Sequence, residues 1–180
     1  MLLSLDAEKA FNRVDWTFLE QTLSKMGFND IFVRWIKTFY KNPRSRVRVN
    51  GHCSEFFPLG RGTRQGDALS PSLFALSIEP LAELIRSDPL IQGILDEGNN
   101  QHKLALFADD ILLCLENPIT SILALLHDLN EYSKVSGYKV NTNKSEAMMI
   151  VGDWPSQLDD LVSFRRSNQG FRYLGVFTHT

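Results

Sequence analysis

Two adjacent carboxylates in the middle of an apolar segment are the feature that most constrains how this chain folds. Asp109 and Asp110 follow the apolar run Leu104–Ala108 and precede a second one, Ile111–Leu115. Such runs are typical of buried strands, whereas burying an unpaired carboxylate costs on the order of several kcal/mol. The pattern therefore predicts a hairpin with both aspartates at or near its turn. A solvated turn and a site for a divalent metal ion both explain it, because Mg²⁺ prefers carboxylate oxygens.

A third carboxylate stands at the end of another apolar run. Asp6 comes directly after Met1–Leu5, which has the composition of a buried strand. Carboxylates at the ends of neighbouring strands can converge, and two metal ions about 4 Å apart between them stabilise an in-line phosphoryl transfer. In the other interpretation, Asp6 caps a helical turn within Ala7–Asn12.

Helical periodicity predicts two helices before residue 43. The first has Asp15 as its N-cap and Gly27 as its stop signal, and its inward residues are Phe18, Leu19, Thr22, Leu23 and Met26. The second runs from Asp30 to the break at Asn42-Pro43, and its inward residues are Phe32, Ile36, Phe39 and Tyr40.

A hairpin and a third helix are predicted next. Arg44–Asn50 alternates with strand periodicity, and the Asn50-Gly51 turn signal predicts pairing with Ser54–Leu59. The helix takes Ser70 as its N-cap and Pro71 as its first residue and ends at Asp88-Pro89. Its predicted buried stripe is Phe74, Ile78, Leu81 and Ile85.

The C-terminal part of the chain continues the mixture of helices and strands. A helix is predicted over Pro118–Ser136 and closed by Gly137, and strands are predicted at Ala147–Val151 and Arg172–Phe177. Strands and helices are interleaved without a regular βαβ rhythm. The order therefore predicts an α+β fold, in which an antiparallel sheet carries the carboxylates and helices pack on one face.

Charge is distributed unevenly along a chain whose formal net charge is only −2. Residues 34–64 contain one acidic residue, Glu55, and eight basic ones: Arg34, Lys37, Lys41, Arg44, Arg46, Arg48, Arg61 and Arg64. A local cationic stretch can bind a polyanion whatever the total charge, although a solvated basic surface explains the pattern equally well.

Length and cysteine usage narrow the class of protein. The 180 residues suit one compact domain, and no apolar run approaches the ~20 residues that cross a bilayer. Cys53 and Cys114 lie far apart without a CxxC or Cys/His cluster. This arrangement argues against a disulfide framework or structural zinc and favours a reducing compartment.

A glycine-rich basic loop completes the candidate site. In Gly62-Thr-Arg-Gln-Gly66 the glycines permit close backbone approach to a ligand, Arg64 can pair with a phosphate, and Gln65 offers a donor and an acceptor. With Asp6 before it and Phe107-Ala-Asp-Asp110 after it, this loop resembles the palm of a reverse transcriptase, most closely those of LINE-type non-LTR retrotransposons. Further matches run along nearly the whole chain: Ser4–Phe11, Leu69-Ser-Pro71, Leu115–Pro118, Ser133–Lys139, Lys144-Ser145 and Tyr173-Leu-Gly175.

The resemblance implies a role for each matching residue. Asp6, Asp109 and Asp110 would be catalytic and would bind two Mg²⁺ ions, with Mn²⁺ as an alternative. Lys144 would protonate the pyrophosphate leaving group, and Phe11 would be the steric gate against a ribose 2′-hydroxyl, unless it is an ordinary core residue. The other substrate-binding residues would be Ala7, Glu8 and Lys9 through their amides, then Arg64, Gln65, Gly66 and Ala108. The primer grip would be Tyr173, Leu174 and Gly175.

The resemblance also implies a biological setting. The chain would be an RNA-directed DNA polymerase acting on an RNA template, a DNA primer and dNTPs. It would belong to a retrotransposon polyprotein in the cytoplasm and nucleus, away from membranes. Residues 1–180 would form a single palm-centred domain fragment that lacks the N-terminal part of the fingers and the thumb.

Two functional hypotheses remain open at this point. The first is an active polymerase palm, and the second is a catalytically inactive remnant that at most binds nucleic acid. Asn12 bears on the choice, because it stands where the family usually has Asp after the gate Phe. A metal-dependent nuclease is disfavoured, because it leaves Gly62–Gly66 and the spacing of Phe11 without a role.

Overall fold

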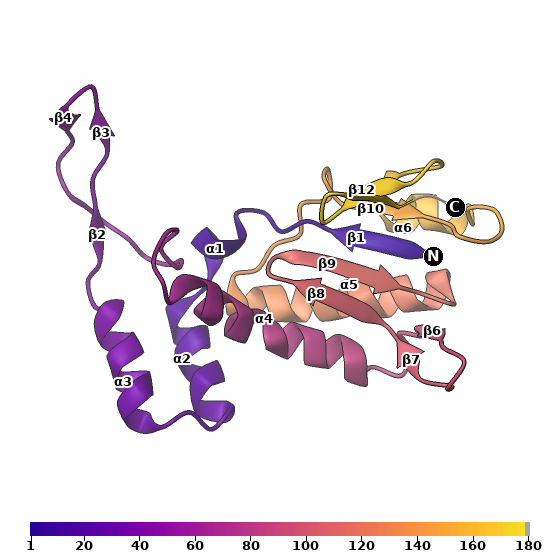
Figure 1. Cartoon of the computed structure of the whole chain (residues 1–180), viewed down its shortest axis with the longest axis horizontal. Helices are drawn as coiled ribbons and strands as arrows, with labels where there is room; N and C mark the ends of the chain where they lie inside the picture. Colours follow the sequence, from indigo (N-terminus) through magenta and orange to yellow (C-terminus); the bar gives the residue numbers. More distant parts are fainter. Residues whose placement is uncertain (179–180) are drawn as a thin grey trace.

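The computed structural model describes residues 1–178 of the chain (Figure 1). The helices are α1 (Ala10–Arg13), α2 (Trp16–Lys25), α3 (Asp30–Phe39), α4 (Ser70–Ser87), α5 (Pro118–Ser136) and α6 (Gln157–Leu161). The strands are β1 (Leu2–Leu5), β2 (Arg44–Ser45), β3 (Arg48–Val49), β4 (His52–Cys53), β5 (Phe57–Pro58), β6 (Ile94–Leu95), β7 (Gln101–His102), β8 (Leu104–Phe107), β9 (Asp110–Cys114), β10 (Glu146–Met148), β11 (Arg165–Arg166), β12 (Phe171–Tyr173) and β13 (Val176–Thr178). In the part of the chain described, no helix has both the length and the apolar composition needed to span a lipid bilayer.

A five-stranded sheet with the order β11-β10-β1-β9-β8 forms the centre of the molecule. Its pairs are antiparallel, as predicted, except that β10 and β11 run parallel at one edge. In the β1–β9 ladder Leu5 lies opposite Ile111. Asp6, which follows β1, and Asp110, the first residue of β9, are therefore at the same end of neighbouring strands.

The core lies between this sheet and the helices packed on it. Alternate residues of the central strands, Leu3, Leu5, Ile111 and Leu113, are fully buried, whereas the intervening residues are half-buried. Figure 1 shows α4 and α5 running along the sheet on one side, and α4 contacts β8. The predicted α+β arrangement, with helices on one face of the sheet, is confirmed.

Most predicted helix ends agree with the structure. The Asp15 carboxylate accepts a hydrogen bond from the Phe18 amide, and α5 ends at Gly137 as predicted. The prediction for Ser70 was wrong by one position. Ser70 is itself the first residue of α4, and the cap residue Leu69 already has helical backbone angles and makes no side-chain cap.

The predicted inward face of α3 was partly wrong. Ile36 is buried as expected, but Phe39 is 61% exposed and shares an open stripe with Ile31 and Trp35, spaced four residues apart. The physical reason is that α3 packs mainly on α2, so that only one side of its apolar surface finds a partner. Met26 at the end of α2 is exposed as well.

The basic hairpin projects away from the sheet and helices (Figure 1). It forms two short ladders, β2 with β5 and β3 with β4, joined with a one-residue shift in register. Asn50 and Gly51 both have positive φ at its tip, as the turn signal predicted. Arg44, Arg46 and Arg48 are exposed, and the Arg46 guanidinium lies 5.1 Å from the centre of the Phe56 ring.

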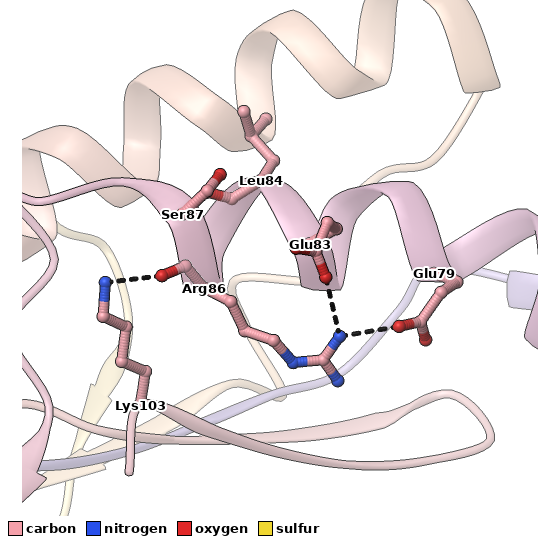
Figure 2. A network of polar contacts seen from close by, with 6 residues as sticks. All are labelled: Glu79, Glu83, Leu84, Arg86, Ser87 and Lys103. Carbon is pink, nitrogen blue, oxygen red and sulfur yellow. Dashed lines mark hydrogen bonds and ion pairs between the residues drawn. The ribbon is translucent and has the colours of Figure 1, made fainter. Parts of the chain in front are cut away.

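The C-terminal end of α4 is tied to the sheet by a buried lysine (Figure 2). Lys103, next to β8, donates hydrogen bonds from Nζ to the Arg86 carbonyl at 2.8 Å and to the Asp88 carbonyl at 2.6 Å. Carbonyls at the end of a helix lack intrahelical partners, and a cation there is favourable. The Arg86 guanidinium in turn binds Glu79 and Glu83 on the outer side of the same helix.

Candidate active site

The backbone that follows β1 is held by hydrogen bonds to residues more than 130 positions away. The Asn141 amide donates to the Asp6 carbonyl at 2.8 Å, and the Asp6 amide donates to Ser145 Oγ at 3.1 Å. The Glu8 amide donates to the Lys139 carbonyl at 2.8 Å. These bonds fix the strand end from which the Asp6 side chain projects.

The Glu8 side chain belongs to this framework too. Its carboxylate lies 2.8 Å from Lys139 Nζ and 3.5 Å from the Arg13 guanidinium. The hydrogen bond to Lys139 is the main reason why the pKa of Glu8 is below its ordinary value. Both the amide and the carboxylate of Glu8 are therefore used within the fold.

The turn between β8 and β9 presents the other two carboxylates. Phe107 pairs with Asp110, which leaves Ala108 and Asp109 as a two-residue turn. Ala108 has a φ of 52°, a left-handed conformation that costs a non-glycine residue roughly 1–2 kcal/mol. This strained turn places Asp109 at the tip of the hairpin and Asp110 at the first position of β9.

A cavity of ≈ 400 Å³ brings many of the predicted residues together. Its predicted members are Asp6, Ala7, Glu8, Lys9, Phe11, Gln65, Asp109 and Lys144. Asn141 also lines the cavity and was not predicted, because nothing in its sequence context distinguishes it from an ordinary turn residue. Arg64 lies elsewhere, in a second cavity with Phe39, Tyr40 and Asp67.

The electrostatics connect Asp110 to the same site. Partial burial raises the pKa of Asp110 first, and the negative charges of Asp109 and Asp6 raise it further. Partial burial also raises the pKa of Tyr173, followed by the charge of Asp110, so the predicted primer grip lies within electrostatic reach of the carboxylates. In the β12–β13 hairpin, Leu174 and Gly175 both have positive φ and form the two-residue turn.

The acidic residues do not form a complete metal cage. Among residues 1–178, no three acidic, His or Cys side chains are gathered closely enough to hold a metal ion by themselves. The carboxylates of Asp6 and Asp109 on one cavity nevertheless fit a divalent cation, because Mg²⁺ is usually bound by one or two carboxylates together with water and substrate phosphates.

The glycine-rich loop is fastened to α1 by backbone contacts. The Gly62 amide donates to the Val14 carbonyl at 2.8 Å, and the Thr63 amide donates to the Phe11 carbonyl at 2.7 Å. Trp16 Nε1 donates to the Gly62 carbonyl at 2.9 Å. A Cβ on Gly62 would lie 2.8 Å from the Asn12 carbonyl oxygen, so the glycine is required by this close approach.

The architecture is that of a polymerase palm. A solved structure of apo telomerase from Candida tropicalis, truncated from its C-terminal domain, has the same fold with a TM-score of 0.57. It is 16% identical, and the match covers 80% of this chain and 29% of that one. The predicted palm fold is confirmed.

Residues 1–177 match the family model of the reverse transcriptase (RNA-dependent DNA polymerase), and the chain belongs to that family. It is 35% identical to an uncharacterized 149 kDa protein of transposon TX1 from Xenopus laevis, over 97% of this chain and 13% of that protein. It is 30% identical to the retrovirus-related Pol polyprotein of the type-2 retrotransposable element R2DM from Drosophila melanogaster, over 99% and 18%. The chain thus spans less than a fifth of the length of either relative, and the predicted kinship with non-LTR retrotransposon enzymes is confirmed.

Proposed function

We propose that residues 1–180 form the palm of an RNA-directed DNA polymerase of a non-LTR retrotransposon, which extends a DNA primer on an RNA template with dNTPs. One observation carries the proposal. Asp6 follows β1, and Asp109 lies in the turn that leads into the neighbouring strand β9. Both line one cavity together with Phe11, Gln65 and Lys144. A carboxylate pair, a lysine and an aromatic side chain around one cavity are the groups that nucleotide addition needs.

Asp6, Asp109 and Asp110 are the residues that would hold divalent metal ions. When bound, two such ions stabilise the charge on the attacking and leaving oxygens of a phosphoryl transfer. The family to which the chain belongs supports this assignment. The raised pKa of Asp110 supports it too: burial is its main cause, but the negative charges of Asp109 and Asp6 add to it, and a cation would neutralise those charges.

The other residues of the cavity would bind and orient the nucleotide. The Glu8 amide already donates to Lys139, so the triphosphate would be received by the amides of Ala7 and Lys9. Lys144 would donate a proton to the pyrophosphate, Gln65 would contact the sugar region, and the Phe11 ring would exclude a 2′-hydroxyl. Ala108 would lie beside the primer terminus, and the Tyr173–Gly175 turn would hold the primer end.

The larger protein would supply the rest of the enzyme. Relatives of five to eight times this length support a polyprotein in which the palm works with fingers and thumb regions. That polyprotein would act in the cytoplasm and nucleus. Residues 1–180 would be one palm-centred unit of it. Asn12 favours a second candidate, an inactive remnant that only binds nucleic acid, because a charge usual in the family is missing beside the cavity.

Metal binding provides the direct test. Mn²⁺ added to residues 1–180 should broaden NMR signals around the cavity, and Asp6→Ala and Asp109→Ala should each weaken binding by at least about tenfold, equivalent to about 1.4 kcal/mol. Asp153→Ala, which changes an exposed carboxylate in a distant loop, is the matched control. Unchanged Mn²⁺ affinity in the Asp6 variant would show that the two strand ends do not form one site.

A further inference from the structure

The Phe11 ring lies against a second aromatic ring that does not belong to the carboxylate cavity. Phe11 and Phe74 stack with ring centroids 4.6 Å apart and planes inclined by 19°. Phe11 is half-buried and lines the cavity, whereas Phe74 is 2% exposed, projects from the first turns of α4, and is absent from the cavity lining. Phe74 therefore lies behind the Phe11 ring and does not itself line the cavity.

The backbone of Phe11 is fixed as firmly as its ring. Its carbonyl accepts hydrogen bonds from the Thr63 amide at 2.7 Å and from Thr63 Oγ1 at 3.3 Å. Thr63 is buried, and its neighbour Gly62 is packed against the Asn12 backbone. With its carbonyl held from the loop and its ring held from α4, Phe11 has little freedom to move away from the cavity.

We propose that Phe74 is a positioning residue that sets the sugar selectivity of this enzyme by holding the Phe11 ring. The inference rests on the proposed function, in which Phe11 excludes a ribose 2′-hydroxyl. The group to be excluded is a single oxygen atom, so a displacement of the ring by about the radius of one atom is enough to admit it. Dense packing behind a residue is what prevents such displacements.

The chemistry predicts which substitutions matter. Phe74→Leu and Phe74→Met leave an apolar side chain in the core but remove the flat surface behind Phe11, so the ring can tilt away from the nucleotide. Phe74→Tyr keeps the ring and should keep the selectivity. Thr63→Val removes one donor to the Phe11 carbonyl, and Thr63→Ser restores it.

The test measures kcat and KM for a dNTP and for the matching rNTP, in a polypeptide that carries residues 1–180 between the flanking regions of the Drosophila relative. Phe74→Leu should raise the ratio of rNTP to dNTP kcat/KM about tenfold, or about 1.4 kcal/mol of differential barrier. The kcat for the dNTP should fall much less than that. Ile85→Ala, a fully buried position further along α4, is the control for lost stability and should leave the ratio unchanged.

The Phe11→Val variant distinguishes the gate role of Phe11 from the positioning role of Phe74. If Phe11→Val admits rNTPs and Phe74→Leu does not, Phe74 has no positioning role while the proposed gate stands. If neither variant changes the ratio, the gate assignment fails and the inference fails with it. A second readout needs no catalysis: in residues 1–180, Phe74→Leu should shift and mobilise the ring signals of Phe11 in NMR spectra. Unaltered Phe11 signals would overturn the proposal.

Discussion

Gly62 and Gly66 stand at the two ends of one motif, and their backbones are superficially alike, with φ values of +95° and +85°. They differ in what surrounds them. A Cβ on Gly66 meets nothing within 4 Å, whereas a Cβ on Gly62 would lie 2.8 Å from the Asn12 carbonyl oxygen. Of these two positions, only that of Gly62 requires glycine both for its backbone conformation and for a close approach to another segment. That approach, to the Asn12 backbone, brings the loop onto α1.

Gly62→Ala should therefore lower the free energy of unfolding by on the order of 3 kcal/mol, from backbone strain and overpacking together. Gly66→Ala should cost about 1 kcal/mol, from strain alone. Thermal denaturation should show the difference, since 1 kcal/mol corresponds to roughly 2–4 °C in a protein of this size. Equal losses in the two variants would mean that the contact with Asn12 is not maintained in solution.

At the level of elements, the hairpin formed by β2 to β5 has the properties of a surface for a polyanion. Arg44, Arg46 and Arg48 are exposed, and none of them is in an ion pair within the described residues. Changing all three to Ala should reduce the steepness of log K against log salt for single-stranded nucleic acid by about 2, because each phosphate contact contributes about 0.7. Fluorescence anisotropy with a labelled RNA measures this slope.

The matched control removes the same number of positive charges from other parts of the molecule. Lys25, Lys134 and Arg165 lie on α2, α5 and β11, and their replacement by Ala should leave the salt dependence nearly unchanged. If the two triple variants have equal slopes of log K against log salt, the arginines of the hairpin form only a solvated basic surface.

Helix α5 contains an acidic residue whose burial is not compensated. Asp128 is buried, and its Oδ2 atom has no hydrogen-bond partner. Burial raises the pKa of Asp128 first, the charge of Asp88 raises it further, and His127 opposes the shift. Between the ordinary pKa of 3.8 and the raised value, the folded state keeps a proton that the unfolded chain has released, so the free energy of unfolding falls as pH rises.

Asp128→Asn should therefore stabilise the protein near neutral pH by about 1 kcal/mol, because the neutral amide replaces a buried carboxylate whose charge is costly to desolvate. The gain should shrink as the pH falls through the raised pKa of Asp128, because the native aspartate then becomes protonated. Melting temperatures measured across this range test the prediction, with Asp153→Asn as an exposed control. A gain that is independent of pH would indicate that the Asp128 carboxyl does not titrate in this window.

At the level of elements, features with a local sequence signal could be predicted, whereas contacts between distant segments could not. Strand ends and helix caps could be predicted because their signals are local: Asp6 follows an apolar run, Asp15 precedes a helix, and Gly137 ends one. The stack of Phe74 on Phe11 and the bonds of Thr63 to Phe11 could not, because they join segments more than 50 residues apart. Phe39 was misassigned because periodicity shows that a helix face is apolar but not whether anything packs against it.

At the scale of the whole molecule, we predict that polymerase activity depends on the regions placed around residues 1–180. Residues 1–180 alone should incorporate dNTPs poorly or not at all, because orienting the primer end and the triphosphate can contribute roughly 7–11 kcal/mol to the rate. The same residues placed between the flanking regions of a relative should extend a primer, and Asp109→Asn should abolish that synthesis. Primer extension on an RNA template, analysed by gel electrophoresis, measures both.

Two outcomes of that experiment have distinct meanings. Vigorous synthesis by residues 1–180 alone would show that the palm positions its substrates without further regions. If the flanked protein is inactive and Asn12→Asp restores synthesis, the sequence is a decayed copy whose defect is the missing charge beside the cavity.

The hydrogen bonds of Lys103 to the C-terminal end of α4 have a consequence for how the proposed enzyme would respond to heating. One end of α4 carries Phe74 beneath Phe11, and the other is joined through Lys103 to β8, which leads into the turn that bears Asp109. The ring proposed to select the sugar and the turn that bears Asp109 are thus both held by α4. In the proposed enzyme, heating that loosens α4 would therefore impair sugar selection and primer extension over the same range of temperature.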